Sequence, residues 1–217
     1  MAPLLLIDLD NTLVDREGAF LAWARSKADQ WAHGDPRAVA YLVEQDDDGF
    51  RPRHELFRVV REQFDLRPSV EELVTDFRRE LREALPAVPE EVIDRLRTLR
   101  ADGWKIAVVT NGDQLGQAGK IDHLGLAQHV DACCISGELG VRKPDPRILE
   151  IAAARCGAEL TDAWMVGDAE ADIMAAHRAR IPSIWLRRRR NWRRSDLTPG
   201  HVADGLLEAL SLLGTVP

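Results

Sequence analysis

Residues 4–12 read LLLIDLDNT, a short apolar run that ends in two aspartates. A continuous apolar run bounded by Asp and Asn is typical of a strand buried inside a sheet, here over 4–9. Side chains two residues apart on a strand point the same way, so Asp8 and Asp10 would present two carboxylates to one pocket. Asp and Asn also form ordinary turns, and the stretch by itself fits a plain strand end equally well.

The residues after this strand fall into two regions of different pattern. Residues 15–85 are helical throughout, most clearly over 69–85, where apolar residues recur at helical spacing behind a Ser69–Glu72 capping box. From residue 86 onward, short strands alternate with helices. Strands are expected at 105–110, 130–135, 163–166 and 183–186, and helices at 90–100, 113–124, 146–156, 169–179 and 206–213.

This alternation predicts the fold class. Strands that alternate with helices imply right-handed crossovers and a parallel sheet with helices on both faces. We therefore expect an α/β protein, a doubly wound parallel sheet with a Rossmann-like core, that carries a small inserted all-helical domain. The core is assigned to residues 1–14 and 86–217, and the insert to residues 15–85.

Composition narrows the class of protein. Of 217 residues, 45% are hydrophobic and 30% are charged, and the net charge of −7 argues against a dedicated nucleic-acid binder. Three cysteines without metal-type or redox-type spacing indicate reduced, mostly buried thiols. The apolar run before Asp8 is too short for a signal peptide, and no stretch has the length of a transmembrane helix. We expect a cytoplasmic protein without a membrane partner, and its oligomeric state is left open.

Polar residues also follow a second predicted strand. Residues 108–112 read VVTNG, so an apolar strand ends in the hydroxyl of Thr110 and continues into Asn111 and Gly112. Glycine lets the backbone approach a ligand closely, and backbone amides at such a turn can cradle an anion. The same residues also form ordinary turns.

Two further segments add a cation and two acids. Residues 140–146 read GVRKPDP, in which prolines hold Lys143 just ahead of a helix, although a solvated lysine is the alternative. Residues 166–172 read VGDAEAD, which places Asp168 at a strand end, where it could simply cap a helix, and Asp172 one helical turn later. Four such elements in order, all at the strand ends where doubly wound sheets bind ligands, are difficult to explain by turn chemistry.

Together the four elements resemble the haloacid dehalogenase-like superfamily, whose signatures are a DxDxT strand end, a strand ending in Thr or Ser, a Lys before a helix, and GDxxxD. The matching residues are Asp8, Asp10, Thr12, Thr110, Lys143, Asp168 and Asp172. The resemblance covers nearly the whole chain, because the helical insert is similar to the family's cap after the first strand. Haloacid dehalogenases lack the second acid and phosphonate hydrolases carry a small residue there, so Asp10 implies the phosphatase branch.

The resemblance also implies roles for these residues. Asp8 would be the nucleophile that forms an aspartyl-phosphate, and Asp10 the general acid/base. Asp8, Asp168 and the backbone carbonyl of Asp10 would hold magnesium. The residues expected to bind the phosphoryl group are Thr110, Asn111, Gly112 and Lys143, while Thr12 and Asp172 would support the site.

Electrostatics favours a metal at such a site. Two like charges about 4 Å apart repel by roughly 4 kcal/mol at a near-surface dielectric, and a phosphate dianion must approach several carboxylates. Magnesium, with its oxygen ligands, and Lys143 would offset this repulsion. We therefore expect a magnesium-dependent phosphatase of a small phosphorylated metabolite. A phosphomutase of the same fold and a non-catalytic module that retains the fold are the alternatives.

Three features remain outside the four elements. Thr110–Asp113 with Gln117 and Lys120 is similar to the branch that includes pyrimidine nucleotidases and sialic acid phosphate phosphatases. Residues 187–194 read RRRRNWRR and are interpreted as a solvated loop rather than a nucleic-acid site. Residues 46–49 read DDDG and are interpreted as a helix-ending turn. A basic cluster in the insert is interpreted as a solvated helix face, with a grip on a second substrate anion as the alternative; its members are Arg51, Arg53, His54 and Arg58.

Overall fold

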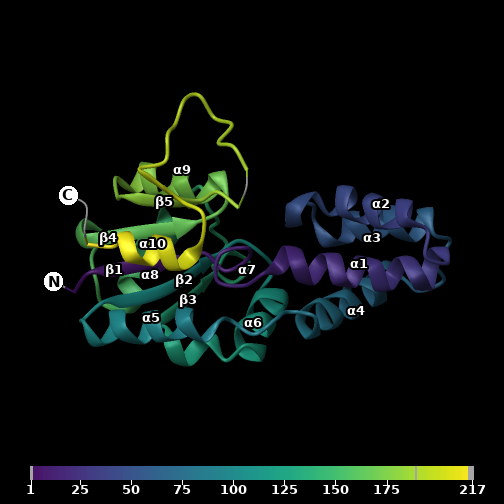
Figure 1. The fold of residues 1–217 in the computed structure, drawn as a ribbon, viewed down its shortest axis with the longest axis horizontal. Helices are drawn as coiled ribbons and strands as arrows, with labels where there is room; N and C mark the ends of the chain where they lie inside the picture. Colours follow the sequence, from purple (N-terminus) through teal and green to yellow (C-terminus); the bar gives the residue numbers. More distant parts are fainter. Residues whose placement is uncertain (1, 189, 215–217) are drawn as a thin grey trace. The chain divides into compact units, whose positions relative to one another are not determined.

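The computed structural model describes residues 2–188 and 190–214. The chain divides into two compact units, which we call the sheet unit and the helical unit (Figure 1). The sheet unit comprises Met1–Val14 and Ala87–Pro217, and the helical unit comprises Asp15–Pro86. Pro86, which the sequence analysis assigned to the core, thus falls in the helical unit.

The sheet unit is built on six parallel strands in the order β3-β2-β1-β4-β5-β6. The strand order reverses beside β1, and the crevice of a doubly wound sheet lies at the carboxyl ends of the strands at such a reversal. The predicted α/β fold class is therefore confirmed. The strands are β1 Leu4–Ile7, β2 Lys105–Thr110, β3 Ala132–Ile135, β4 Ala163–Gly167, β5 Ser183–Leu186 and β6 His201–Ala203.

Helices cover both faces of this sheet (Figure 1). On one face α8 packs on β1, β2 and β3 while α9 packs on β4 and β5; on the other, α5 contacts β2 and α10 contacts β5, β6 and α5. This double cover explains why all four residues of β1 are fully buried. The helices are α5 Glu90–Ala101, α6 Gln114–His123, α7 Ser136–Leu139, α8 Arg147–Cys156, α9 Glu170–Ala179 and α10 Leu206–Leu212.

Besides the short helix α7, which was not predicted, and a later start of β3, the end of β1 and the edge of the sheet differ from the sequence prediction. β1 ends at Ile7 rather than at residue 9, because the amides of Leu13 and Val14 both donate to the carbonyl of Leu9 and turn the chain. The edge strand β6 was not predicted, since three residues are too few to show a strand period. No helix within residues 2–188 and 190–214 has the length and apolar character needed to cross a bilayer.

The helical unit packs four helices around a cluster of aromatic rings. Ser69 and Glu72 form the predicted capping box at the start of the fourth helix, with reciprocal bonds of 3.2 and 2.8 Å. Trp23 lies edge-on to Phe77, with ring centroids 4.9 Å apart, and both contact Phe57. The helices are α1 Arg16–Ala32, α2 Pro36–Asp46, α3 Arg53–Gln63 and α4 Val70–Glu83.

A buried ion-pair network joins three of these segments. Asp46, with a side chain only 3% exposed, accepts two bonds from Arg16 at 2.6 and 2.8 Å and one from Arg53 at 2.8 Å. Arg53 also donates to the carbonyl of Gly49. The chain does turn after Asp46, where α2 ends. The interpretation of the basic cluster as a solvated face is wrong for Arg53, because its guanidinium neutralises a buried carboxylate.

We predict that Asp46→Ala destabilises the protein by about 3–5 kcal/mol, because the substitution leaves Arg16 buried without its carboxylate. Asp76→Ala is the matched control in the same unit. Asp76 also pairs with an arginine, Arg79, but the side chain of Asp76 is 58% exposed. That control is expected to change the free energy of unfolding by no more than about 0.5 kcal/mol. Chemical denaturation measures both, and equal losses would contradict the prediction.

Candidate active site

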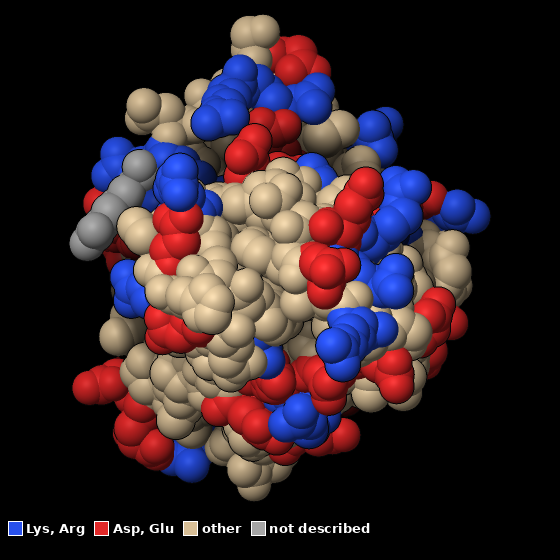
Figure 2. All heavy atoms as spheres, turned by 90° about the vertical axis from the view of Figure 1, so that its right-hand side faces the viewer, with Lys and Arg blue, Asp and Glu red and all other residues tan. Residues whose placement is uncertain are grey.

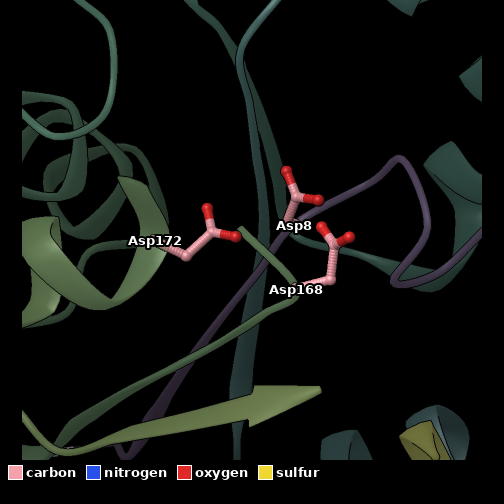
Figure 3. A group of neighbouring side chains, drawn as sticks. All are labelled: Asp8, Asp168 and Asp172. Atoms are coloured by element: carbon pink, nitrogen blue, oxygen red, sulfur yellow. The ribbon is translucent and has the colours of Figure 1, made fainter. Parts of the chain in front are cut away.

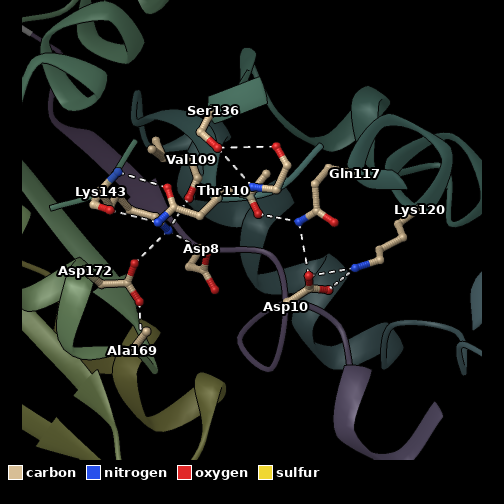
Figure 4. A network of polar contacts seen from close by, with 12 residues as sticks. Asp8, Asp10, Val109, Thr110, Gln117, Lys120, Ser136, Lys143, Ala169 and Asp172 are labelled. Carbon is tan, nitrogen blue, oxygen red and sulfur yellow. Dashed lines mark hydrogen bonds and ion pairs between the residues drawn. The ribbon is translucent and has the colours of Figure 1, made fainter. Parts of the chain in front are cut away.

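The predicted polar residues meet at the carboxyl ends of the central strands. Asp8 directly follows β1, Asp168 follows β4, Thr110 ends β2, and Lys143 lies in the loop before α8. Figure 4 shows Asp8, Asp10, Thr110, Lys143 and Asp172 in one network.

A buried lysine lies at the centre of this network. The ammonium of Lys143, whose side chain is 2% exposed, lies 2.6 Å from Asp8 Oδ1 and 2.6 Å from Asp172 Oδ1, and it donates to the carbonyl of Val109. Burial by itself would lower the pKa of Lys143, but the charges of Asp172 and Asp8 outweigh burial and raise it. Lys143 is therefore a fixed cation beside Asp8.

Asn111 holds this lysine in place. The side-chain amide of Asn111 donates to the carbonyl of Lys143 and accepts from its backbone amide, each at 2.9 Å. From the sequence, Asn111 is expected to bind the phosphoryl group. The structure gives it contacts that fix the Lys143 loop against the end of β2.

Three carboxylates gather beside the lysine. One oxygen from each of Asp8, Asp168 and Asp172 lies within 4.8 Å of the others, and all three residues are buried (Figure 3). Burial, together with the charge of Asp8, raises the pKa of Asp168 to about 6. Burial also raises the pKa of Asp172 to about 7, although Lys143 opposes the shift. Burial likewise raises the pKa of Asp8. Lys143 alone therefore does not balance these acids.

The donor set fits magnesium, a hard cation that takes oxygen ligands. Asp8 and Asp168 offer carboxylate oxygens at the ends of adjacent strands. Asp172 is placed for support, because one of its oxygens meets Lys143 and the other accepts from the amide of Ala169 at 2.9 Å.

Two glycines make room for the polar side chains. A Cβ on Gly167 would lie 2.2 Å from Oδ2 of Asp172, so this position must be glycine to admit that acid. A Cβ on Gly112 would lie 2.7 Å from Cγ of Gln117. Gly112 was expected to approach the phosphoryl group, and the structure shows that it also admits a neighbouring side chain. Thr12 is buried, and within the described residues its Oγ1 has no hydrogen-bond partner.

The side chain of Asp10 turns toward helix α6. Its two oxygens each lie 2.6 Å from Nζ of Lys120, and Oδ2 accepts from Nε2 of Gln117 at 3.1 Å. The same nitrogen donates to Oγ1 of Thr110 at 2.6 Å. Gln117 and Lys120 were similar to one branch of the family in sequence, but they were not among the predicted site residues. Their i, i+3 spacing on one helix, which puts both on one face, is the signal that could have placed them there.

The basic loop also reaches the site. Arg188 and Arg190 donate to Oδ2 of Asp168 at 2.7 and 2.8 Å, and Arg190 also donates to its carbonyl. The interpretation of residues 187–194 as a solvated loop is therefore wrong for these two arginines; Arg189 lies outside the described residues. The loop follows β5, and β5 pairs with β4, so its start lies beside the end of the strand that carries Asp168.

A family model described as haloacid dehalogenase-like hydrolase matches residues 3–180. The chain belongs to the haloacid dehalogenase-like hydrolase family. Among curated relatives, it is 36% identical to a phosphoserine phosphatase of Thermus thermophilus over 63% of this chain and 55% of that protein. It is 29% identical to a phosphoglycolate phosphatase of Agrobacterium fabrum over 85% of this chain and 80% of that protein. The chain thus spans about half the length of the first relative.

A solved structure supports the fold of this haloacid dehalogenase-like hydrolase. The putative hydrolase YfnB of Bacillus subtilis, a structure bound to magnesium, superposes with a TM-score of 0.77. The match covers 98% of this chain and 99% of that chain at 20% identity. At this identity the likeness concerns the fold.

The raised pKa values predict how magnesium and protons compete. A carboxyl whose pKa rises on folding holds its proton more tightly in the folded state, so Asp168 and Asp172 lose stabilising contributions as pH rises from 3.8 through about 6 and about 7. Magnesium binds the deprotonated oxygens, so it should raise the melting temperature more at about pH 7.5 than at about pH 5.5.

Differential scanning calorimetry of the chelated and magnesium-loaded protein measures this difference. Asp168→Asn should lose most of the magnesium effect. Asp94→Asn, at an exposed acid of α5, should retain it. An equal magnesium effect at both pH values would count against this site.

Proposed function

We propose that this protein is a magnesium-dependent phosphatase that hydrolyses a small phosphate monoester through an aspartyl-phosphate on Asp8. The observation that carries this proposal is the buried contact of 2.6 Å between Lys143 Nζ and Asp8 Oδ1 at the end of the central strand. A nucleophilic carboxylate repels the phosphate dianion that it must attack. A fixed cation beside the carboxylate offsets this repulsion.

The chemistry divides into two displacements. An oxygen of Asp8 attacks phosphorus, the new O–P bond forms, and the bond to the ester oxygen breaks while protonated Asp10 gives that oxygen its proton. Water then attacks phosphorus, Asp10 takes a proton from the water, and the acyl-phosphate bond breaks to regenerate Asp8. One acid two residues after the nucleophile can serve both steps.

The remaining residues bind and orient the phosphoryl group. Thr110 Oγ1 accepts from Gln117, so its own hydrogen can be donated to a phosphoryl oxygen. Lys143 offsets negative charge on that group. Magnesium, held by Asp8, Asp168 and the Asp10 carbonyl, would neutralise the charges that repel a phosphate dianion.

The similarity to two phosphatases of small phosphorylated acids supports a small metabolite as the substrate. A nucleic-acid substrate is disfavoured by the net charge of −7. On the face in Figure 2, Lys and Arg are interspersed with Asp and Glu, without a broad field of positive charge. We retain a cytoplasmic location as part of this proposal.

Asp8→Asn is predicted to lower phosphate release from an aryl phosphate by at least about 10³-fold, because the amide is a poor nucleophile. The parent protein, quenched in acid during turnover, should carry a phosphoryl group on Asp8 that mass spectrometry of its peptides detects. Asp94→Asn serves as the control and should retain parent activity. Substantial turnover by the Asp8→Asn variant would assign the nucleophile to another residue.

Chelation should abolish phosphate release, and added magnesium should restore it. A panel of phosphorylated metabolites then separates the alternatives. A phosphatase releases inorganic phosphate and the free alcohol in equal amounts, whereas a phosphomutase returns the phosphoryl group to give an isomeric phosphate. A non-catalytic module gives neither product.

A further inference from the structure

Two side chains of helix α6, Gln117 and Lys120, converge on the acid that the proposed reaction uses twice. Figure 4 shows Gln117 between Thr110 and Asp10, with Lys120 directed at the same carboxylate. The helix is anchored at its start, where Asp113 accepts a bond from the amide of Gly116 at 2.9 Å. Both donors are thus carried by one capped helix.

The ion pair between Lys120 and Asp10 is largely buried, so forming it costs free energy of desolvation that a purely structural contact would not need. The side chain of Lys120 is 8% exposed and that of Asp10 is 23% exposed. Lysine is almost never buried without a partner, and a buried ion pair is commonly no more stabilising than an apolar pair of similar volume. A tie between α6 and the loop after β1 could therefore be made with apolar side chains alone.

The geometry restricts the conformations of Asp10. Lys120 reaches both carboxylate oxygens at 2.6 Å, and Gln117 reaches Oδ2 at 3.1 Å. The Gln117 atom that faces a carboxylate must be the amide nitrogen, since an ionised carboxylate only accepts. An acid/base on a loop has to present an oxygen within hydrogen-bond reach of the reacting group, and such fixed donors hold the side chain near that position.

The same nitrogen of Gln117 joins two parts of the site. It donates to Oγ1 of Thr110 at 2.6 Å as well as to Asp10. The residue that is proposed to contact the phosphoryl group and the residue that moves the proton therefore share one donor. The close approach of Gly112 to Gln117 shows that the surrounding turn is shaped around this side chain.

We propose that Lys120 and Gln117 are positioning residues that fix the Asp10 carboxylate for proton transfer. This inference rests on the proposed phosphatase function. Lys120 contacts Asp10, so its contribution should pass through that residue, whereas Gln117 contacts Thr110 as well. Loss of Lys120 should therefore impair the steps that need an acid or a base and spare the step that does not.

The test uses the full chain with magnesium and a chromogenic aryl phosphate. The aryl group leaves without protonation, so its burst of release reports phosphorylation of Asp8, whereas the steady state includes hydrolysis of the aspartyl-phosphate, which needs Asp10 as a base. Lys120→Met should leave the burst rate and kcat/KM near the parent values, and it should lower the steady-state rate at least about tenfold together with the Michaelis constant. With an alkyl phosphate, whose leaving group needs a proton, Lys120→Met should lower the rates of both steps.

A double-mutant cycle and two further variants sharpen the result. Lys120→Met added to Asp10→Asn should cost nothing further, because a positioning residue acts only through its partner. Lys120→Arg should restore part of the steady-state rate. Lys105→Met is the matched control, since Lys105 pairs with Asp131 at the opposite end of β2, and it should retain both rates. Should Lys120→Met fail to fold, Gln117→Leu should lower the steady-state rate as well, and its burst also reports the lost contact with Thr110.

Three outcomes would overturn the assignment. These are a parent-like steady state in Lys120→Met and Gln117→Leu, an equal loss of burst and steady state in Lys120→Met, or an additional loss when Lys120→Met is added to Asp10→Asn. If the parent protein shows neither burst nor turnover with any phosphate ester, the phosphatase proposal itself fails. An active parent with a parent-like Lys120→Met variant rejects only the role of α6.

Discussion

The ammonium of Lys143, buried between Asp8 and Asp172, is the interaction on which the site depends. It lies where the strand order of the sheet reverses, so the loops after several strands can reach it. Removing one partner of a buried ion pair leaves the other charge unpaired, which destabilises a protein more than the loss of a surface contact. The residues around this lysine are accordingly held by further contacts. Asn111 fixes its backbone, Gly167 admits Asp172, and the amide of Ala169 holds the second oxygen of that acid.

Three acids lie buried together in the site. Lys143 pairs with two of them, Asp8 and Asp172, and burial raises the pKa of all three. In the structure Asp168 also accepts from Arg188 and Arg190 of the loop after β5. The same carboxylate is one of the expected magnesium ligands, so the basic loop and a cation would meet at a single side chain.

The helical unit also contains a buried ion-pair network, at residues that have no role in the proposed reaction. Asp46 is neutralised by Arg16 and Arg53 within a unit whose core is otherwise aromatic. Both units therefore contain a buried charge with matched partners. In the helical unit a single acid meets two arginines, whereas at the end of β1 oxygens of three acids lie within 4.8 Å of one another, and such a group of carboxylate oxygens suits a cation.

The sequence by itself determined the order of the strands and helices of the core, since apolar periods and turn residues act locally. It also indicated Asp8, Thr110, Lys143, Asp168 and Asp172 as site residues, because they lie at or near the carboxyl ends of predicted strands and match the four signatures that the chain shares with the hydrolase family. It could not pair Asp10 with Lys120, which lies 110 residues further along the chain. Nor could it place Arg188 on Asp168, separate Arg53 from its solvated neighbours, or show that Gly112 admits Gln117. These contacts depend on which loops the parallel sheet brings to one edge, and only the tertiary structure decided that arrangement.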